Sequence, residues 1–109
     1  MTWKLYLDDL RPPPDETWVV ARSVPAAWHY ICTYGLPREM SLDHDLGTNV
    51  DAPVLLHSLI EAYLDHVESN PSHEHFAGVR NIKFKVHSAN PTGSRNMEQL
   101  WANFLRCTA

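Results

Sequence analysis

The chain has 109 residues, of which 44% are hydrophobic and 20% charged, and its formal net charge is −4. This length suits one domain with one core, spanning residues 1–109, and is too short for two. No apolar run approaches the roughly 18 residues that a membrane span needs, and no signal peptide precedes the first strand pattern, so we expect no membrane partner. The acidic balance argues against duplex nucleic acid as a ligand. Cys32 and Cys107 stand alone in the sequence, which favours reduced thiols and a cytoplasmic setting.

The first half of the chain predicts two short strands and a helix. Residues 3–7 alternate apolar and polar side chains, as a half-buried strand does. Residues 10–16 include three consecutive prolines, so they form neither a helix nor a central strand. Residues 17–21 are β-branched and aromatic, which favours a second strand. A helix is expected over residues 24–34, between a serine cap and a glycine stop.

The second half predicts two more strands and two more helices. Residues 40–42 form a short apolar strand. Residues 51–67 repeat apolar side chains at the spacing of an amphipathic helix. A polar loop is expected at residues 69–78, followed by an alternating strand at residues 81–86. The last helix is expected over residues 94–106.

The order of these elements indicates an α/β domain with a mainly parallel sheet. In such sheets, ligands bind outside the carboxyl ends of the strands. Three of the four predicted strands end in polar residues with reactive side chains. They are Asp8 and Asp9 after the first strand, Asp43, His44 and Asp45 after the third, and His87, Ser88 and Asn90 after the fourth.

The aspartates at two strand ends predict a metal site. If the first and third strands are parallel neighbours, Asp8, Asp9, Asp43 and Asp45 converge at one edge of the sheet. Carboxylates that crowd together raise each other's pKa unless a cation lies between them. A set of carboxylates without soft ligands suits Mg²⁺ or Mn²⁺. The alternative is that these aspartates only end strands and begin turns.

Polar residues near the aspartates suggest phosphate binding and proton transfer. Ser88 and Asn90 can donate hydrogen bonds to phosphate oxygens, and the Arg11 guanidinium can clamp a phosphate. His87 or His44 can move a proton near neutral pH. Structural alternatives remain for three of them: a salt bridge for Arg11, a hydrogen-bonded strand end for His87, and an electrostatic partner of the flanking acids for His44.

Three motifs resemble the cyclic-phosphate processing receiver-like family, an offshoot of the CheY-like response-regulator receiver domains. They are LYLDDLRPPP at residues 5–14, SLDHDLG at residues 41–47 and VHSANP at residues 86–91. The resemblance covers nearly the whole chain in order. It implies a three-layered, receiver-like (flavodoxin-like) fold, which here would have the mainly parallel four-stranded sheet and three helices of the predicted elements. It also implies that the protein handles a cyclic phosphate.

Receiver domains in general imply roles for individual residues. Asp8 and Asp9 match the acidic pair that holds Mg²⁺, Asp43 matches the phospho-accepting aspartate, and Ser88 matches the hydroxyl that touches the phosphoryl group. The departures are equally informative. A Pro-rich loop replaces the first receiver helix, the fifth strand and its lysine are missing, and the two histidines of the motifs have no receiver counterpart. A conventional phosphorelay is therefore disfavoured.

Two functions from different classes follow. The first is a metal-dependent phosphodiesterase or phosphohydrolase that hydrolyses a nucleotide-derived cyclic phosphate, with Asp43, His44 and His87 as its catalytic residues. The second is a non-catalytic signalling or ligand-binding module that binds a phosphorylated ligand or accepts phosphate. The added histidines favour the enzyme.

The number of helices predicts how the sheet is covered. The two helices that cross between strands should share one face, because such crossovers are right-handed. The last helix is then expected to cover the other face, with Leu100, Trp101 and Phe104 against the first and fourth strands.

One helix is narrower than four strands, so part of the second face should remain open. The candidates for exposed aromatic residues are Trp3, Tyr6 and Trp18. An exposed patch of this kind favours a homodimer. The alternative is that the lysines at positions 4, 83 and 85 make the face wettable and leave a monomer.

Overall fold

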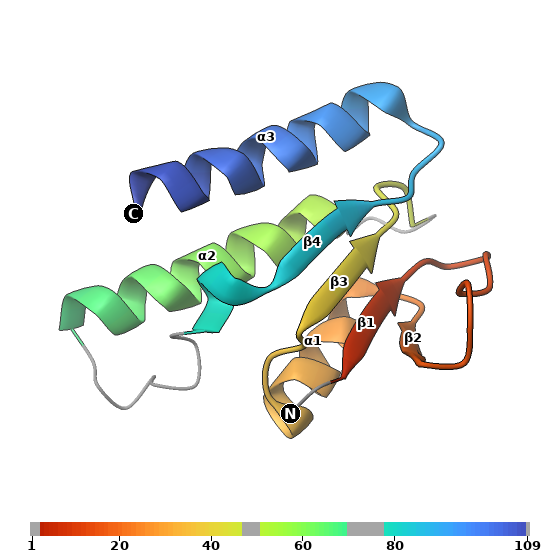
Figure 1. Cartoon of the computed structure of the whole chain (residues 1–109), viewed down its shortest axis with the longest axis horizontal. Coiled ribbons are helices and arrows are strands. Elements are labelled where there is room, and N and C mark those ends of the chain that lie inside the picture. The colour runs from red at the N-terminus through yellow and green to blue at the C-terminus, as the bar shows by residue number, and fades with distance from the viewer. Residues whose placement is uncertain (1–2, 47–50, 70–77, 109) are drawn as a thin grey trace.

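The computed structural model describes residues 3–46, 51–69 and 78–108, and its helices and strands follow the predicted order (Figure 1). In chain order they are β1 (Lys4–Leu7), β2 (Trp18–Ala21), α1 (Val24–Tyr34), β3 (Glu39–Leu42), α2 (Ala52–Ser69), β4 (Lys83–Val86) and α3 (Pro91–Cys107). Most of the polar loop predicted at residues 69–78 lies outside the described residues. None of the described helices is both long enough and apolar enough to cross a membrane.

The four strands form one parallel sheet in the order β2-β1-β3-β4. β1 and β3 are therefore neighbours, as the predicted acidic site requires. Both crossovers, through α1 and through α2, step in the same direction along the sheet, which places both helices on one face. This four-stranded parallel sheet with three helices is the predicted receiver-like, flavodoxin-like fold. Within the described residues, no helix lies between β1 and β2 and no strand follows α3.

The ends of α1 follow from local sequence. The Ser23 hydroxyl accepts a hydrogen bond from the Ala26 N–H at 3.3 Å, as an N-cap does. Gly35 has a φ of 87° and donates its N–H to the Ile31 carbonyl at 2.9 Å. A positive φ is costly for residues with a Cβ atom, so glycine ends the helix here.

One face of the sheet carries the hydrophobic core. The register aligns Leu5 with Met40, and Met40 with Phe84, so these side chains share a face. α1 and α2 cover this face (Figure 1). Their fully buried side chains are Ala27, Ile31, Ala52, Leu55, Leu56 and Leu59.

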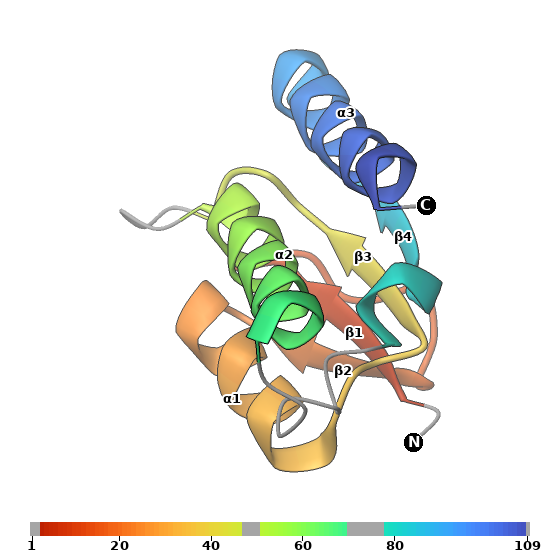
Figure 2. The same cartoon turned by 90° about the vertical axis from the view of Figure 1, so that its left-hand side faces the viewer.

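The position of α3 differs from the prediction. Its Trp101 ring lies 5.6 Å from the Phe84 ring of β4, and its Phe104 ring lies 5.4 Å from the Tyr63 ring of α2. Phe84 belongs to the core face, so α3 packs against the β4 edge of the sheet from the same side as α1 and α2 (Figure 2). The placement of Leu100, Trp101 and Phe104 against the second face is therefore wrong, and the fold has two layers and not three. The reason is that Tyr63 of α2 and Phe84 of β4 present apolar surface beside the β4 edge, and the apolar face of α3 packs against it.

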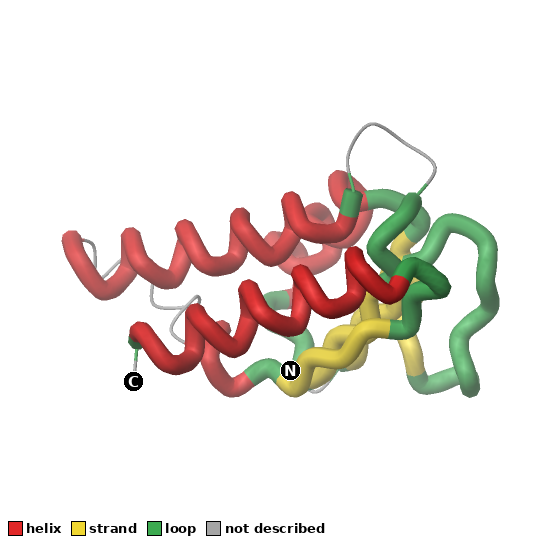
Figure 3. The backbone as a smooth tube through the Cα atoms, turned by 90° about the horizontal axis from the view of Figure 1, so that it is seen from above, coloured by secondary structure: helices red, strands yellow, loops and turns green. Residues whose placement is uncertain are grey.

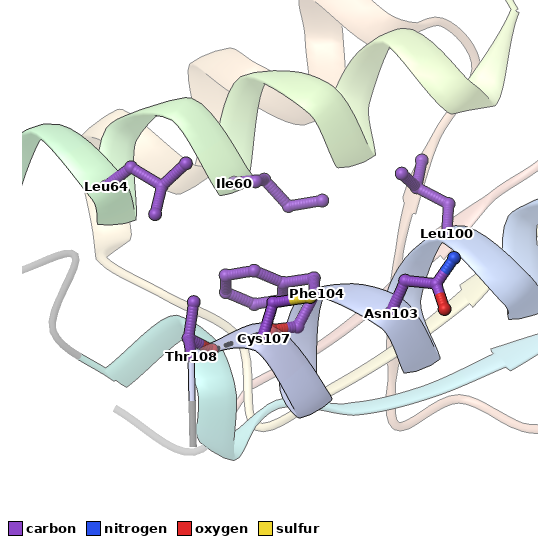
Figure 4. Close-up of a pocket in the computed structure, with 7 residues that line it drawn as sticks. All are labelled: Ile60, Leu64, Leu100, Asn103, Phe104, Cys107 and Thr108. Carbon is purple, nitrogen blue, oxygen red and sulfur yellow. Dashed lines mark hydrogen bonds between the residues drawn. The ribbon is translucent and has the colours of Figure 1, made fainter.

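α2 and α3 run side by side away from the carboxyl edge of the sheet (Figure 3). An apolar groove of about 290 Å³ stays open between them. Ile60 and Leu64 of α2 face Leu100 and Phe104 of α3 across this groove (Figure 4). The groove is therefore formed by the helices, away from the polar residues at the carboxyl ends of the strands.

The second face of the sheet carries no helix among the described residues, yet its aromatic rings are covered. The ammonium groups of Lys4 and Lys85 lie 4.4 and 5.1 Å from the centre of the Trp18 ring. Trp18 is 8% exposed, and Tyr6, whose ring meets it edge-on, is 5% exposed. Trp3 does not belong to this face: it is partly buried on the core face, where its ring meets those of Tyr30 and Tyr34 of α1. The expected exposure of Tyr6 and Trp18 is therefore wrong. Lysine stems cover the Trp18 ring while their charges stay in water, and the Tyr6 ring packs between Trp18 and His87.

Candidate functional site

A row of four side chains, one from each strand, lies at the carboxyl edge of the sheet. The register aligns the last residues of the four strands, and the residue after each extends that alignment. In sheet order the row is Arg22, Asp8, Asp43 and His87. The main-chain N–H groups of Asp8, Asp43 and His87 continue the ladder, with N···O distances between 2.9 and 3.1 Å. Because side chains alternate along a strand, the whole row belongs to the second face.

Asp8 makes the most hydrogen bonds in this row. Its Oδ1 accepts the N–H groups of Leu10 and Arg11, both at 2.9 Å, and its Oδ2 lies 2.9 Å from His87 Nε2. Burial opposes the charged form of Asp8, which is 1% exposed. The Arg11 and Leu10 N–H groups and the His87 ring outweigh burial and hold the pKa of Asp8 below its usual value. Asp8 is therefore ionised at neutral pH and fixed in position.

Asp9 and Asp43 complete an acidic group with Asp8. One carboxylate oxygen from each residue lies within 4.8 Å of the others. Asp43 is 8% exposed, and in the described part of the chain no donor bonds its carboxylate. Buried carboxylates nearly always have partners. Three carboxylates without a thiolate suit a hard ion, so these residues could hold Mg²⁺ or Mn²⁺.

His87 is bonded through both ring nitrogens. Nε2 meets Asp8, and Nδ1 lies 2.7 Å from the Ser41 hydroxyl, which is 2% exposed. The Tyr6 ring stacks on the imidazole at 4.3 Å with 7° between the planes. Ser41 can donate to a neutral imidazole or accept from a charged one, so both forms of His87 keep their bonds. The predicted alternative of a hydrogen-bonded strand end describes this geometry.

Arg11 and Arg22 tie strand ends together through main-chain carbonyls. Arg11 Nη1 donates to the His87 carbonyl at 2.7 Å. Arg22 Nη1 donates to the carbonyls of Asp8 at 3.2 Å and of Arg11 at 3.1 Å. Across the described ranges, neither guanidinium forms an ion pair with a carboxylate. The salt bridge considered for Arg11 is therefore absent there, and its charge is available.

His44 and Asp45 turn toward α3 and form a second cluster. His44 Nδ1 lies 2.7 Å from Asp45 Oδ1, and Asn90 Nδ2 donates to Asp45 Oδ2 at 3.2 Å. These bonds, the one from His44 first, lower the pKa of Asp45. His44, Asp45 and Asp51 also have ligand atoms within 4.8 Å of one another, as a group distinct from the acidic group. The structure thus divides the predicted metal and catalytic residues between two places.

Ser88 and Asn90 shape the turn into α3. Asn90 Oδ1 accepts the Gly93 N–H at 2.9 Å and caps the helix, which is why α3 begins at Pro91, earlier than predicted. The Ser88 hydroxyl accepts the Asn90 N–H at 3.0 Å. Its own proton has no acceptor among the described residues. Ser88 can therefore donate to a ligand, whereas both polar atoms of the Asn90 side chain are already bonded.

Three residues of the site were missed by sequence reasoning. Arg22 follows β2 directly, just as Asp8 follows β1, so all four strands end in polar residues. Tyr6 and Ser41 lie two residues before Asp8 and Asp43, which puts them on the same face. Burial, and then the Asp8 carboxylate, raise the pKa of Tyr6. The alternation of side chains along a strand could have identified Tyr6 and Ser41, because it places them on the same face of the sheet as Asp8 and Asp43.

The sequence model of the cyclic-phosphate processing receiver domain family matches residues 3–103. The chain belongs to this family, and it is a receiver-like domain associated with cyclic-phosphate processing. The match includes every member of the row and both clusters described above. No curated protein and no solved structure matches the chain.

Proposed function

We propose that this protein is a metal-dependent enzyme that hydrolyses a cyclic phosphate, with a nucleotide-derived phosphodiester as its substrate. The observation that carries the proposal is Asp43, a buried carboxylate that lies beside two further carboxylates and has no donor among the described residues. The family supports the class of substrate. Mg²⁺ or Mn²⁺, when bound by Asp8, Asp9 and Asp43, supplies charge neutralisation and orients water.

The protein's own residues bind the phosphate and move protons. In the proposed reaction, water adds to phosphorus and one ring P–O bond breaks, which leaves a phosphate monoester and a hydroxyl group. The Ser88 hydroxyl and the Arg11 guanidinium donate to phosphate oxygens. A base takes the proton from water, and the departing oxygen gains one.

Two histidines are candidates for this proton transfer. His87 is closer to the acidic group, but its Nε2 is bonded to Asp8, so it releases or accepts a proton at Nδ1 through Ser41. His44 uses only Nδ1, on Asp45, in the part of the chain described. His87→Ala should change the pH profile of the rate if His87 transfers the proton. If it only orients Asp8, it should lower the rate at every pH.

The second candidate function is a non-catalytic module that binds a phosphorylated ligand or accepts phosphate on Asp43. The occupied ring nitrogens of His87 favour this reading, because they leave no free base beside the acidic group. Both functions suit the cytoplasm, where the free and exposed thiols of Cys32 and Cys107 stay reduced.

Incubation with 2′,3′- and 3′,5′-cyclic nucleotides tests the proposal. We expect turnover with Mg²⁺ or Mn²⁺, none in EDTA, and none for Asp43→Asn, which removes charge but little volume. Glu61→Gln is the matched control, because Glu61 is an exposed residue of α2. Binding of these nucleotides without turnover would favour the module instead.

A further inference from the structure

Two guanidinium groups lie at the row, and no described carboxylate pairs with either of them. Arg22 makes both of its hydrogen bonds through one nitrogen, Nη1, and both acceptors are main-chain carbonyls. Its Nε and Nη2 groups have no partner among the described residues. Arg11 likewise uses Nη1 alone, on the carbonyl of His87 after β4. Each guanidinium is thus held through Nη1 alone, and its Nε and Nη2 groups can donate a pair of hydrogen bonds to phosphate oxygens.

Tyr6 adds a buried donor at the same place. Its ring is held between the His87 ring, stacked at 4.3 Å, and the Trp18 ring, edge-on at 6.0 Å. The residue is 5% exposed, yet its hydroxyl has no hydrogen-bond partner in the described part of the chain. The charged side chains that act on this hydroxyl are those of Asp8, Asp43, Arg11 and Arg22. A buried hydroxyl without a partner is costly, so a ligand oxygen is the expected acceptor.

We propose that Arg22 and Tyr6 bind the oxygens of a ligand phosphate beside Asp8, and that Arg11 contributes a further donor from the side of His87. The ligand class rests on the proposed function. The new element is the set of donors: a guanidinium from the end of β2 and a phenol from within β1. Ligand oxygens placed there meet donors from β1 and β2 on one side and the acidic group on the other. This set would hold a phosphate whether or not the protein turns it over.

Titration with inorganic phosphate tests this assignment. Affinity is measured for the whole protein by calorimetry, once with saturating Mg²⁺ and once in EDTA. The variants are Arg22→Gln, Tyr6→Phe and the control Arg38→Gln. Arg38 is an exposed arginine just before β3, at the opposite edge of the sheet, so its change removes the same charge away from the row.

We expect Arg22→Gln to weaken phosphate binding by about tenfold or more, and Tyr6→Phe by about fivefold, as for the loss of a charged and a neutral hydrogen bond. Arg38→Gln should stay close to wild type. Equal effects of Arg22→Gln and Arg38→Gln would overturn the proposal, as would a wild-type protein that binds no phosphate. Tyr6→Phe keeps the ring that packs on His87, so it remains informative even if Arg22→Gln melts early.

The two proposals fail in distinguishable ways. A wild-type protein that ignores Mg²⁺ but binds phosphate through Arg22 in EDTA would remove the proposed metal-dependent enzyme and keep the subsite. If the protein binds Mg²⁺ but all three variants have the same phosphate affinity, the phosphate subsite is overturned and the metal-dependent enzyme is kept.

Discussion

The Nε2 atom of His87 lies 2.9 Å from Oδ2 of Asp8, and this contact spans β3, which lies between their two strands. Ser41 of β3 holds the other ring nitrogen at 2.7 Å. The imidazole therefore joins three strand ends and fixes the orientation of one carboxylate of the acidic group. Histidine–carboxylate pairs of this kind orient metal ligands in many proteins. Asp8 and Asp43 differ sharply in this respect, because Asp43 has no such support among the described residues.

Asp8→Asn should lower the free energy of unfolding by about 1 to 3 kcal/mol at pH 7 in EDTA. The amide oxygen can still accept the two main-chain N–H groups, but the amide nitrogen in place of Oδ2 cannot accept from His87. The pKa of Asp8 is lowered by folding, so its contribution is present above the unfolded value near 3.8 and is lost as pH falls through the folded value. Urea denaturation from pH 7 downward should show the two proteins converging below that value. A difference that stays constant over this range would contradict the account.

Asp43→Asn should behave in the opposite way. In EDTA this variant should melt no lower than wild type, because the amide removes repulsion within the acidic group and breaks no described hydrogen bond. Thermal melting of the two aspartate variants side by side makes the comparison. An equal loss of stability in Asp43→Asn and Asp8→Asn would contradict the account, because it would show that the Asp43 carboxylate has a stabilising partner.

Gly93→Ala tests the position of His44. An added Cβ would lie 2.6 Å from two ring atoms of His44, so the ring must move. Overpacking should cost about 1 to 3 kcal/mol, despite the better helix propensity of alanine. In a His44→Ala background the same substitution should be neutral or stabilising, and this double-mutant cycle isolates the contact. Equal losses in both backgrounds would show that the ring does not occupy that place.

The covered second face predicts a monomer. Lys4 and Lys85 shield Trp18, and Lys83 is exposed on the same face, so the aromatic patch that favoured a homodimer is absent there. Sedimentation at micromolar concentration should give one species near 12.5 kDa. A dimer would contradict this and would make the groove between α2 and α3 the next surface to test, with Leu64→Asp as the variant.

The sequence predicted the elements, their order and the parallel sheet, because two-residue and helical periodicities are local properties of the chain. It also predicted that Asp8, Asp9, Asp43 and Asp45 meet, since the carboxyl ends of neighbouring parallel strands share an edge. The first three do, whereas Asp45 lies with His44 in the second cluster. The side of the sheet that α3 covers was not predictable in this way. In the part of the chain that the structure describes, no strand follows α3, so the handedness rule does not constrain this helix. Packing against Tyr63 and Phe84 decides its position.

Side-chain partners were the other unpredictable element. His87 and His44 looked equivalent in the sequence, as histidines beside strand ends. One is locked between Asp8 and Ser41, and the other turns to Asp45 over Gly93. Such choices depend on rotamers and on main-chain donors supplied by distant loops, which residue patterns do not encode.

Calorimetric titration of Mg²⁺ and Mn²⁺ into the protein tests the central claim most directly, which is that Asp8, Asp9 and Asp43 bind a divalent cation. Wild type and the control Glu61→Gln should bind the ion with the same affinity, and Asp43→Asn should bind it about tenfold or more weakly, because it loses a charged ligand. Identical binding by wild type and Asp43→Asn, or no binding by wild type at millimolar metal, would contradict the account.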